Sequence, residues 1–378
     1  MATPVSLFDY DLPQELIAQH SVEPRDHSRL MVVGRKTGER QHKRFYEIVD
    51  ELHPGDALVM NNTKVFRARL EATVQSVSLR AQRSNPSIEL FLLRPRNGMW
   101  EALVKPGRHI HVGDTIHAGE LEGKVISKSD IVTINFVQSD KIVLDYANAH
   151  GQIPIPPYVY ETPKTLEQYQ TVYAQETGSV AAPTAGFHFT QELLEKIRAK
   201  GVEIHYVTLH VGLGTFRPMK SETLEAHEMH REFVTIDSNT TQAINRAKQE
   251  GRRVIAVGTT TVRTLEGVAA LHHGHIEPFT GDVNLFITPG FEFKVVDALI
   301  TNFHLPKSTL LVLVSAFATR EHIFSAYQEA IREHYRFFSF GDAMFISIRN
   351  IDENKRIVYT SARNSTNQVE DNDHPVPP

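Results

Sequence analysis

The chain of 378 residues contains no cysteine, which excludes disulfides, thiolate nucleophiles and cysteine-ligated zinc or iron–sulfur clusters. It also lacks a long apolar run, because Leu310–Phe317 is interrupted by Ser315 and a membrane span needs about 20 residues. Residues Met1–Phe8 have neither the basic nor the apolar region of a secretory signal. The net charge of -5 gives no overall attraction to nucleic acid, so any RNA contact needs a local basic patch. We therefore expect a cytoplasmic globular enzyme.

The hydrophobic pattern divides the chain into three parts. From residue 67 to 150, short β-rich runs alternate with turn signals such as Asn97-Gly98, which predicts an inserted all-β barrel domain. Strands alternate with helices on both sides of it, so residues 1–66 and 151–349 are expected to form one discontinuous α/β domain, a mostly parallel sheet with covering helices. Residues 350–378 are polar and aperiodic, which indicates a disordered tail, and the loop 80–87 is expected to be an exposed hairpin loop.

Two helices of the α/β domain are predicted from their ends. Asp11 and Pro13 give a start signal for a helix near the amino terminus that buries Leu16. Ser308 is expected to start a nearly all-apolar helix that runs to Ala318. A helix with that composition must be buried on every side.

Two runs mix small, hydroxyl and apolar residues in a pattern that fits neither an amphipathic helix nor a half-exposed strand. They are residues 179–190 (SVAAPTAGFHFT) and 209–216 (LHVGLGTF), and they contain His188 and His210. Such a mixture suits a backbone that approaches a ligand closely. One such run alone would be better explained as a buried turn. Because two runs flank one helix and one strand, we expect them to form the wall of a pocket.

A third candidate follows a buried strand, where Gly258 permits a turn into a helix that begins with Thr259 and Thr260. Hydroxyls beside the free amides of a helix N-terminus suit a carboxylate or phosphate, with Arg263 nearby. An ordinary capped turn explains the pattern equally well. Asn302 and His304 also end a strand, at the edge where α/β sheets bind ligands. Hydrogen bonds that fix the turn explain these two residues equally well.

Two further patterns have both a functional and a structural explanation. His227 and His230 would share a helical face, as metal ligands can, but a hydrogen-bonded pair fits the spacing better. Basic residues gather at 64–69, and Arg336 stands among aromatics in the run 335–344. Arginines and aromatic rings can contact phosphates and bases of RNA, whereas a solvated face and core packing are the ordinary explanations.

Several long blocks resemble the signature segments of the S-adenosylmethionine:tRNA ribosyltransferase-isomerase family of queuosine biosynthesis, in matching order from about Phe8 to Ile348. They are residues 26–30, 55–65, 180–190, 209–216, 256–263, 286–290, 296–310 and 335–344. The departures are few: Ser21 and Arg67 stand where the family usually has proline, Phe187 replaces leucine and Thr319 replaces glycine. None of these changes removes a polar group that we would call catalytic.

The resemblance implies a tRNA modification enzyme, a transferase and isomerase. It would move the ribosyl moiety of S-adenosylmethionine to the 7-aminomethyl-7-deazaguanine base in the tRNA anticodon, giving epoxyqueuosine-tRNA with release of adenine and methionine. S-adenosylmethionine is then a cosubstrate, and we expect no cofactor and no metal. The expected partners are this tRNA and S-adenosylmethionine, with no membrane; the working expectation for the oligomeric state, which the sequence leaves open, is a monomer.

This chemistry suits imidazole, because a sulfonium acidifies the neighbouring ribose carbon and adenine needs a proton to leave. We predict His188 and His210 as the catalytic base or acid. The predicted substrate-binding residues are Thr184, Gly186, Gly212, Gly214, Thr215, Thr259, Thr260, Arg263, Asn302 and His304, with the methionine carboxylate at Thr259, Thr260 and Arg263. The predicted tRNA contacts are Lys64, Arg67, Arg69 and Arg336. The rival functions are a metal-dependent hydrolase at His227 and His230, and an RNA-binding module without catalysis.

Overall fold

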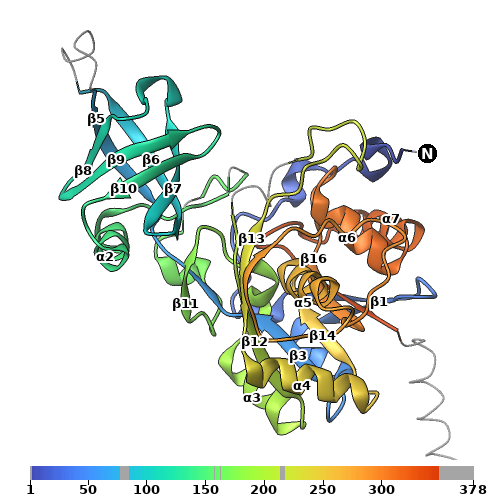
Figure 1. Cartoon of the computed structure of the whole chain (residues 1–378). Coiled ribbons are helices and arrows are strands. Elements are labelled where there is room, and N and C mark those ends of the chain that lie inside the picture. The colour runs from blue at the N-terminus through green and yellow to red at the C-terminus, as the bar shows by residue number, and fades with distance from the viewer. Residues whose placement is uncertain (1, 77–84, 157, 162, 213–217, 349–378) are drawn as a thin grey trace, which may run out of the picture.

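The computed structural model describes residues 2–76, 85–156, 158–161, 163–212 and 218–348 and has two parts (Figure 1). A β-barrel with one helix lies beside a larger α/β part, and the chain enters the barrel from the α/β part and returns to it. The predicted tail 350–378 and most of the loop 80–87 lie outside the described residues. The predicted combination of an α/β fold with an inserted barrel is confirmed.

The α/β part is built on a sheet of nine strands in the order β15-β13-β12-β3-β14-β16-β17-β1-β2. In chain order the strands are β1 (Arg29–Gly34), β2 (Arg40–Arg44), β3 (Ala57–Asn61), β12 (Glu203–His210), β13 (Glu232–Ile236), β14 (Val254–Val257), β15 (Phe279–Val283), β16 (Ala298–Asn302) and β17 (Ala343–Ser347). The central pairs from β12 to β16 and the pair β17–β1 are parallel, as expected. The other pairs are antiparallel, so the parallel arrangement is a property of the sheet's centre.

Helices cover both faces of this sheet, because its central strands are apolar on both sides. On β3, Ala57 and Val59 join the core that contains α4 to α7, while Leu58 and Met60 join a second core under α1 and α3. The helices are α1 (Ile48–Glu51), α3 (Gln191–Ala199), α4 (Ser238–Gln249), α5 (Thr259–Leu271), α6 (Thr309–Ala318) and α7 (Arg320–Arg332). The predicted apolar helix is α6, which is almost entirely buried and capped by Ser308.

The barrel is closed by six strands in the order β10-β7-β6-β5-β8-β9. They are β5 (Arg69–Gln75), β6 (Ser87–Arg96), β7 (Met99–Lys105), β8 (Thr115–Ala118), β9 (Leu121–Lys128) and β10 (Val132–Phe136), followed by helix α2 (Asp140–His150). Alternate residues fill its interior, as the buried Leu70, Ala72 and Val74 of β5 show. Closure removes the open edges that a sheet of this size would otherwise expose.

Two ion pairs connect the barrel to the α/β part. Arg94 and Arg96 of β6 each contact Asp282 of β15, at 3.1 and 3.2 Å, and both also contact Glu101 on β7. A separate small sheet pairs β4 (Thr63–Val65) with β11 (Glu176–Ser179) where the chain passes between the two parts. The barrel is therefore held beside the edge of the sheet near β15.

One local prediction was wrong, and one strand was not predicted. The predicted amino-terminal helix is only a 3₁₀ turn over Gln14–Leu16. It ends there because Ile17 and Ala18 become extended and pair with the backbone of Phe337. Strand β2 has the polar sequence Arg-Gln-His-Lys-Arg and gave no apolar signal, because it lies at the edge of the sheet. None of the helices in the described ranges combines the length and the apolar character that crossing a bilayer requires.

Candidate active site

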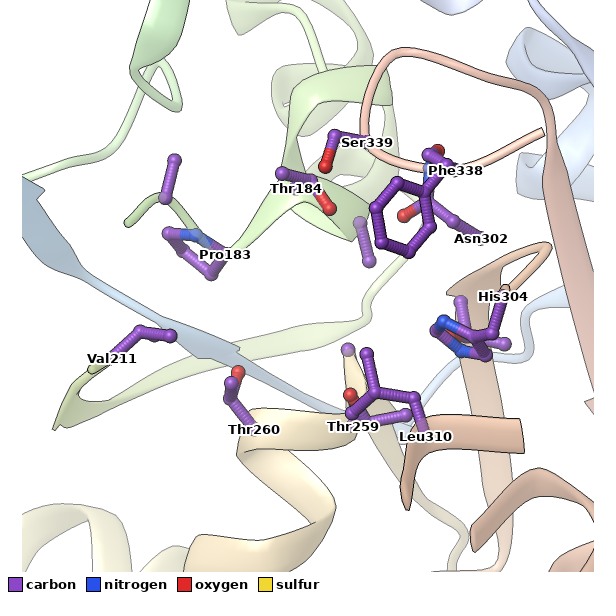
Figure 2. A pocket seen from close by; sticks show the side chains of 14 residues that line it. Pro183, Thr184, Val211, Thr259, Thr260, Asn302, His304, Leu310, Phe338 and Ser339 are labelled. Atoms are coloured by element: carbon purple, nitrogen blue, oxygen red, sulfur yellow. Dashed lines mark hydrogen bonds between the residues drawn. The ribbon is translucent and has the colours of Figure 1, made fainter. Parts of the chain in front are cut away.

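A pocket opens where strands β14 and β16 end, the edge at which α/β sheets bind ligands (Figure 2). The space between its walls is about 440 Å³, open mouth included. Segments from five parts of the chain line it: Ala182, Pro183, Thr184, Ala185, Val211, Gly258, Thr259, Thr260, Thr301, Asn302, His304, Leu310, Phe338 and Ser339. We call this the main pocket. Both small-residue runs of the sequence contribute to its wall, as expected.

The amino terminus of helix α5 forms one side of the main pocket (Figure 2). Gly258 makes the turn from β14 with a φ of +88°, a backbone conformation that favours glycine. Thr259 and Thr260 follow and direct their hydroxyls toward the cavity, whereas Thr261 donates its hydroxyl to the carbonyl of Val257. Backbone amides at such a terminus favour an anionic group.

His304 is the histidine that lines the main pocket. Its Nε2 lies 2.9 Å from the hydroxyl of Thr301, and the hydroxyls of Tyr327 and Tyr10 hold its backbone amide and carbonyl. Burial lowers the pKa of His304 to about 3, so the ring is neutral at pH 7. From the sequence, His304 was predicted as a substrate-binding residue and not as a catalytic one.

His188 lies behind the wall of the main pocket. Its Nε2 is 3.2 Å from the side-chain amide nitrogen of Asn302, and its Nδ1 is 2.7 Å from the hydroxyl of Ser28. Because the amide donates to Nε2, the proton of the neutral ring belongs on Nδ1. Burial and then the nearby Arg336 and Arg25 lower the pKa of His188 to about 3. Both ring nitrogens are thus used within the protein, and Asn302 is the link between His188 and the pocket.

His210 faces away from the main pocket. Its chain neighbours Leu209, on β12, and Val211, just after it, both enter the large core, so the alternation of extended backbone turns His210 to the other side. There its Nδ1 is 2.8 Å from the hydroxyl of Thr63, and its ring stacks on Phe233. Burial, followed by the positive charge of Arg94 on the barrel, lowers its pKa to about 4.

The predicted glycines have different surroundings. A Cβ on Gly186 would lie 1.9 Å from the hydroxyl oxygen of Tyr173, so this glycine permits close packing of the wall. A Cβ on Gly212 would meet nothing within 4 Å. The predictions for Gly214 and Thr215 lie outside the described residues.

Arg263 is one helical turn beyond Thr259 and Thr260, and its side chain does not line the main pocket. Its guanidinium forms a buried ion pair with Glu232 of β13 and donates to the carbonyls of Leu285 and His230. It lines a second cavity of about 970 Å³, open mouth included, together with His227 and His230. The structure therefore brings Thr184, Thr259, Thr260, Asn302 and His304 together, but not Arg263.

Three of the four predicted tRNA contacts lie where the chain passes from the α/β part to the barrel. Lys64 is exposed on β4, Arg67 donates to the carbonyl of Gly151, and Arg69 is 3.7 Å from Glu89 on the barrel. Arg336 lines a small cavity of about 190 Å³ next to the main pocket, in which His188 also takes part. Of these four residues, Arg336 is the one near the candidate site.

The main pocket also has an apolar side, and none of its residues was named as a site residue from the sequence. Phe338, Leu310 and Val211 supply it, and Ser339 adds a hydroxyl that is 2.5 Å from the hydroxyl of Tyr158. Phe338 belongs to the aromatic run 335–344, for which core packing was the ordinary explanation. Nothing in the local sequence distinguishes Phe338 from the aromatic residues beside it. Within the described ranges, we find no group of three or more histidine, aspartate or glutamate side chains that could hold a metal ion.

Two comparisons show what the chain is similar to. The model of a family described as queuosine biosynthesis protein matches residues 5–346. Among solved structures, the chain is similar to the S-adenosylmethionine tRNA ribosyltransferase of Thermotoga maritima, with 40% sequence identity and a TM-score of 0.52. The match covers 90% of this chain and 100% of the other.

Proposed function

The chain belongs to the queuosine biosynthesis protein family, and on this premise we propose that it is the S-adenosylmethionine:tRNA ribosyltransferase-isomerase. It transfers the ribosyl moiety of S-adenosylmethionine to a 7-aminomethyl-7-deazaguanine base in the tRNA anticodon and isomerises it, giving epoxyqueuosine-tRNA. Adenine and methionine are released. Because its tRNA substrate is found in the cytoplasm, we expect the enzyme to act there.

The observation that carries this proposal is the main pocket. It combines a helix amino terminus, several hydroxyls, an amide and one imidazole with an apolar aromatic wall. S-adenosylmethionine presents the matching groups, namely a carboxylate, ribose hydroxyls and an aromatic base. We propose that the carboxylate binds the amides at Thr259 and Thr260, as expected from the sequence. Arg263 then has a supporting role, because its ion pair with Glu232 anchors α5 to β13.

We propose His304 as the group that moves the proton. The ring is neutral at neutral pH, so it can accept a proton from the ribose carbon next to the sulfonium. An imidazole whose pKa is lowered is a weak base but a strong conjugate acid once protonated, and a strong acid is what the leaving adenine needs. One imidazole could therefore serve both steps, with the proton taken from the carbon and given to adenine.

In this proposal His188 acts through Asn302. The side-chain amide nitrogen of Asn302 donates to Nε2 of His188 and to the carbonyl of Phe338. The amide oxygen of Asn302 is therefore left to face the ligand. For His188 to act as a base directly, the bound substrate would have to displace this amide. His210 is separated from the pocket by its own strand, and the geometry supports it less as a proton carrier.

For tRNA we propose the side of the molecule on which Lys64, Arg67 and Arg69 follow the passage to the barrel, with Arg336 nearest the site. Phosphate contacts of this kind are sensitive to salt, so affinity for tRNA should fall steeply as salt rises. Substitution of Lys64, which is exposed and has no ion pair within the described residues, should reduce that salt dependence.

The test is incubation of the purified chain with S-adenosylmethionine and tRNA that carries the deazaguanine precursor, with chromatographic measurement of adenine and methionine. We expect one adenine per modified tRNA and none with tRNA that carries guanine at that position. Binding of tRNA without adenine release would instead support the RNA-binding alternative. Activity that requires added zinc or manganese would support the hydrolase alternative.

Variants assign the histidines in the same assay. His304→Gln should reduce kcat at least about 100-fold, because general acid–base groups contribute roughly that much. His210→Gln is the matched control and should leave kcat within a few-fold of wild type. If His210→Gln lost the activity and His304→Gln kept it, the assignment of His304 would be abandoned.

A further inference from the structure

Phe338 has a backbone conformation that a bulky side chain avoids. Its φ is +75°, in the left-handed region where a non-glycine residue is strained. Its amide donates to the carbonyl of Phe303, and its carbonyl accepts from the side chain of Asn302 and from the amide of Gly341. Contacts on both sides therefore impose this conformation, and such strain concentrates at functional sites.

The strained backbone directs the ring of Phe338 into the main pocket (Figure 2). Leu310 and Thr259 lie on the other side of the cavity, so the space between them and the ring is bounded by apolar and hydroxyl groups. The ring of Tyr158 packs edge-on against Phe338, with ring centres 3.9 Å apart, and the Tyr158 hydroxyl is bound to Ser339. Tyr158 thus fixes the orientation of the Phe338 ring.

The neighbours of this ring are suited to the edge of a base. Asn302 binds the carbonyl of Phe338 through its amide nitrogen, which leaves the amide oxygen as an acceptor beside the ring. The hydroxyl of Thr184 also lies at the cavity. A flat aromatic face with an acceptor and a hydroxyl at its rim is the arrangement with which proteins hold a nucleobase.

We propose that Phe338 is a stacking platform for a bicyclic purine-type base in the main pocket. The base is either the adenine of S-adenosylmethionine or the deazaguanine of the tRNA, since both present the same flat face. This inference rests on the proposed function. It makes Phe338 a ligand-contacting residue that determines specificity for a nucleobase, whereas core packing is the ordinary explanation of its sequence.

The experiment compares ligands that differ only in the base. S-adenosylhomocysteine carries adenine, and S-ribosylhomocysteine lacks it. Calorimetry gives the Kd of each for wild type, Phe338→Leu and Phe338→Met, and the ratio of the two Kd values measures how strongly the base is recognised. Both substitutions keep an apolar side chain on the same backbone but remove the aromatic face.

The stacking of a base on an aromatic ring contributes roughly 5- to 150-fold in affinity. If adenine stacks on Phe338, the preference for S-adenosylhomocysteine should shrink by about that factor in both variants, with the Kd of S-ribosylhomocysteine little changed. If deazaguanine stacks there, this ratio stays as in wild type. The preference for precursor-bearing tRNA over tRNA that is abasic at the same position then shrinks instead.

Phe337→Leu is the matched control. Phe337 is the preceding aromatic residue, is completely buried in the large core and does not line the pocket. Its substitution should lower the Tm without changing either ratio. The proposal is overturned if Phe338→Leu and Phe338→Met leave both ratios as in wild type.

A failure of the proposed function looks different. In that case wild type itself would release no adenine from S-adenosylmethionine with precursor-bearing tRNA. If wild type is active and the variants keep both base preferences, the stacking inference alone is lost.

Discussion

The ion pair between Arg263 and Glu232 gives the sharpest test of what the structure adds to the sequence. The sequence pattern assigned Arg263 to the carboxylate of a ligand. In the structure its side chain is only 3% exposed and that of Glu232 only 4%, and the two charges contact each other. The perturbation is a cycle of three variants: Arg263→Met, Glu232→Gln and the double variant.

The expected magnitudes follow from burial. Removal of one member of a buried pair leaves the other charge without compensation, which costs about 3–5 kcal/mol. Replacement of both removes that penalty. What then remains is the loss of donors to the carbonyls of Leu285 and His230, about 1–2 kcal/mol. The double variant should therefore be more stable than Arg263→Met, and the coupling energy should be at least about 3 kcal/mol.

Urea denaturation of the four proteins gives the unfolding free energies, and calorimetry with S-adenosylhomocysteine gives the Kd. A supporting role for Arg263 predicts that the Kd of the folded double variant stays within about threefold of wild type. The reasoning is refuted if Arg263→Met weakens this binding more than about tenfold while Glu232→Gln does not, because Arg263 would then bind the ligand directly.

Three further predictions concern stability. Thr319→Gly should stabilise the protein by about 1 kcal/mol in urea denaturation. Thr319 has a φ of +70°, and the relief of that strain exceeds the entropic cost of glycine and the loss of the side-chain cap on the amide of His322; a lower stability would show that the strain is smaller than these two costs together. Gly186→Ala should destabilise by about 2–3 kcal/mol through its clash with the Tyr173 hydroxyl, and Tyr173→Phe should recover part of that loss; no recovery would place the clash elsewhere. Stability should also fall as the pH drops below 6.5 toward 3, because burial lowers the pKa of His188 and His304 to about 3, so that the unfolded chain binds protons in this window and the folded chain does not. Each histidine contributes about 2 kcal/mol of this loss at pH 5, and His188→Gln or His304→Gln should flatten the pH dependence of the unfolding midpoint.

Much of the architecture could be predicted from local patterns. Turn signals and alternating residues identify the barrel because each strand buries one face and exposes the other. The apolar run that begins at Thr309 identifies a fully buried helix. Both patterns are formed by residues that are close in sequence, so these elements can be predicted without knowing which distant segments they contact. The edge strand β2 was missed because a strand with little buried surface has no such pattern.

The candidate site was predictable as a set of segments but not as a set of side chains. Thr184, Thr259 and Asn302 do meet in one cavity, because the segments that hold them lie at one edge of the sheet. Which histidine faces that cavity depends on the orientation of single residues. His304 enters it, His188 is blocked by Asn302, and His210 points to the other side of its strand.

The sequence alone determined the family, through the resemblance of its long blocks to the family's signature segments. Composition and periodicity along the chain determined the barrel inserted in an α/β fold and the segments that build the pocket. Only the tertiary structure decided the roles of individual groups. The partner of Arg263, the hydrogen bonds of His188 and the strained backbone of Phe338 all come from segments far apart in the chain. The physical reason is that charge pairing, desolvation and backbone strain depend on distances in space, and these exist only once the chain has folded.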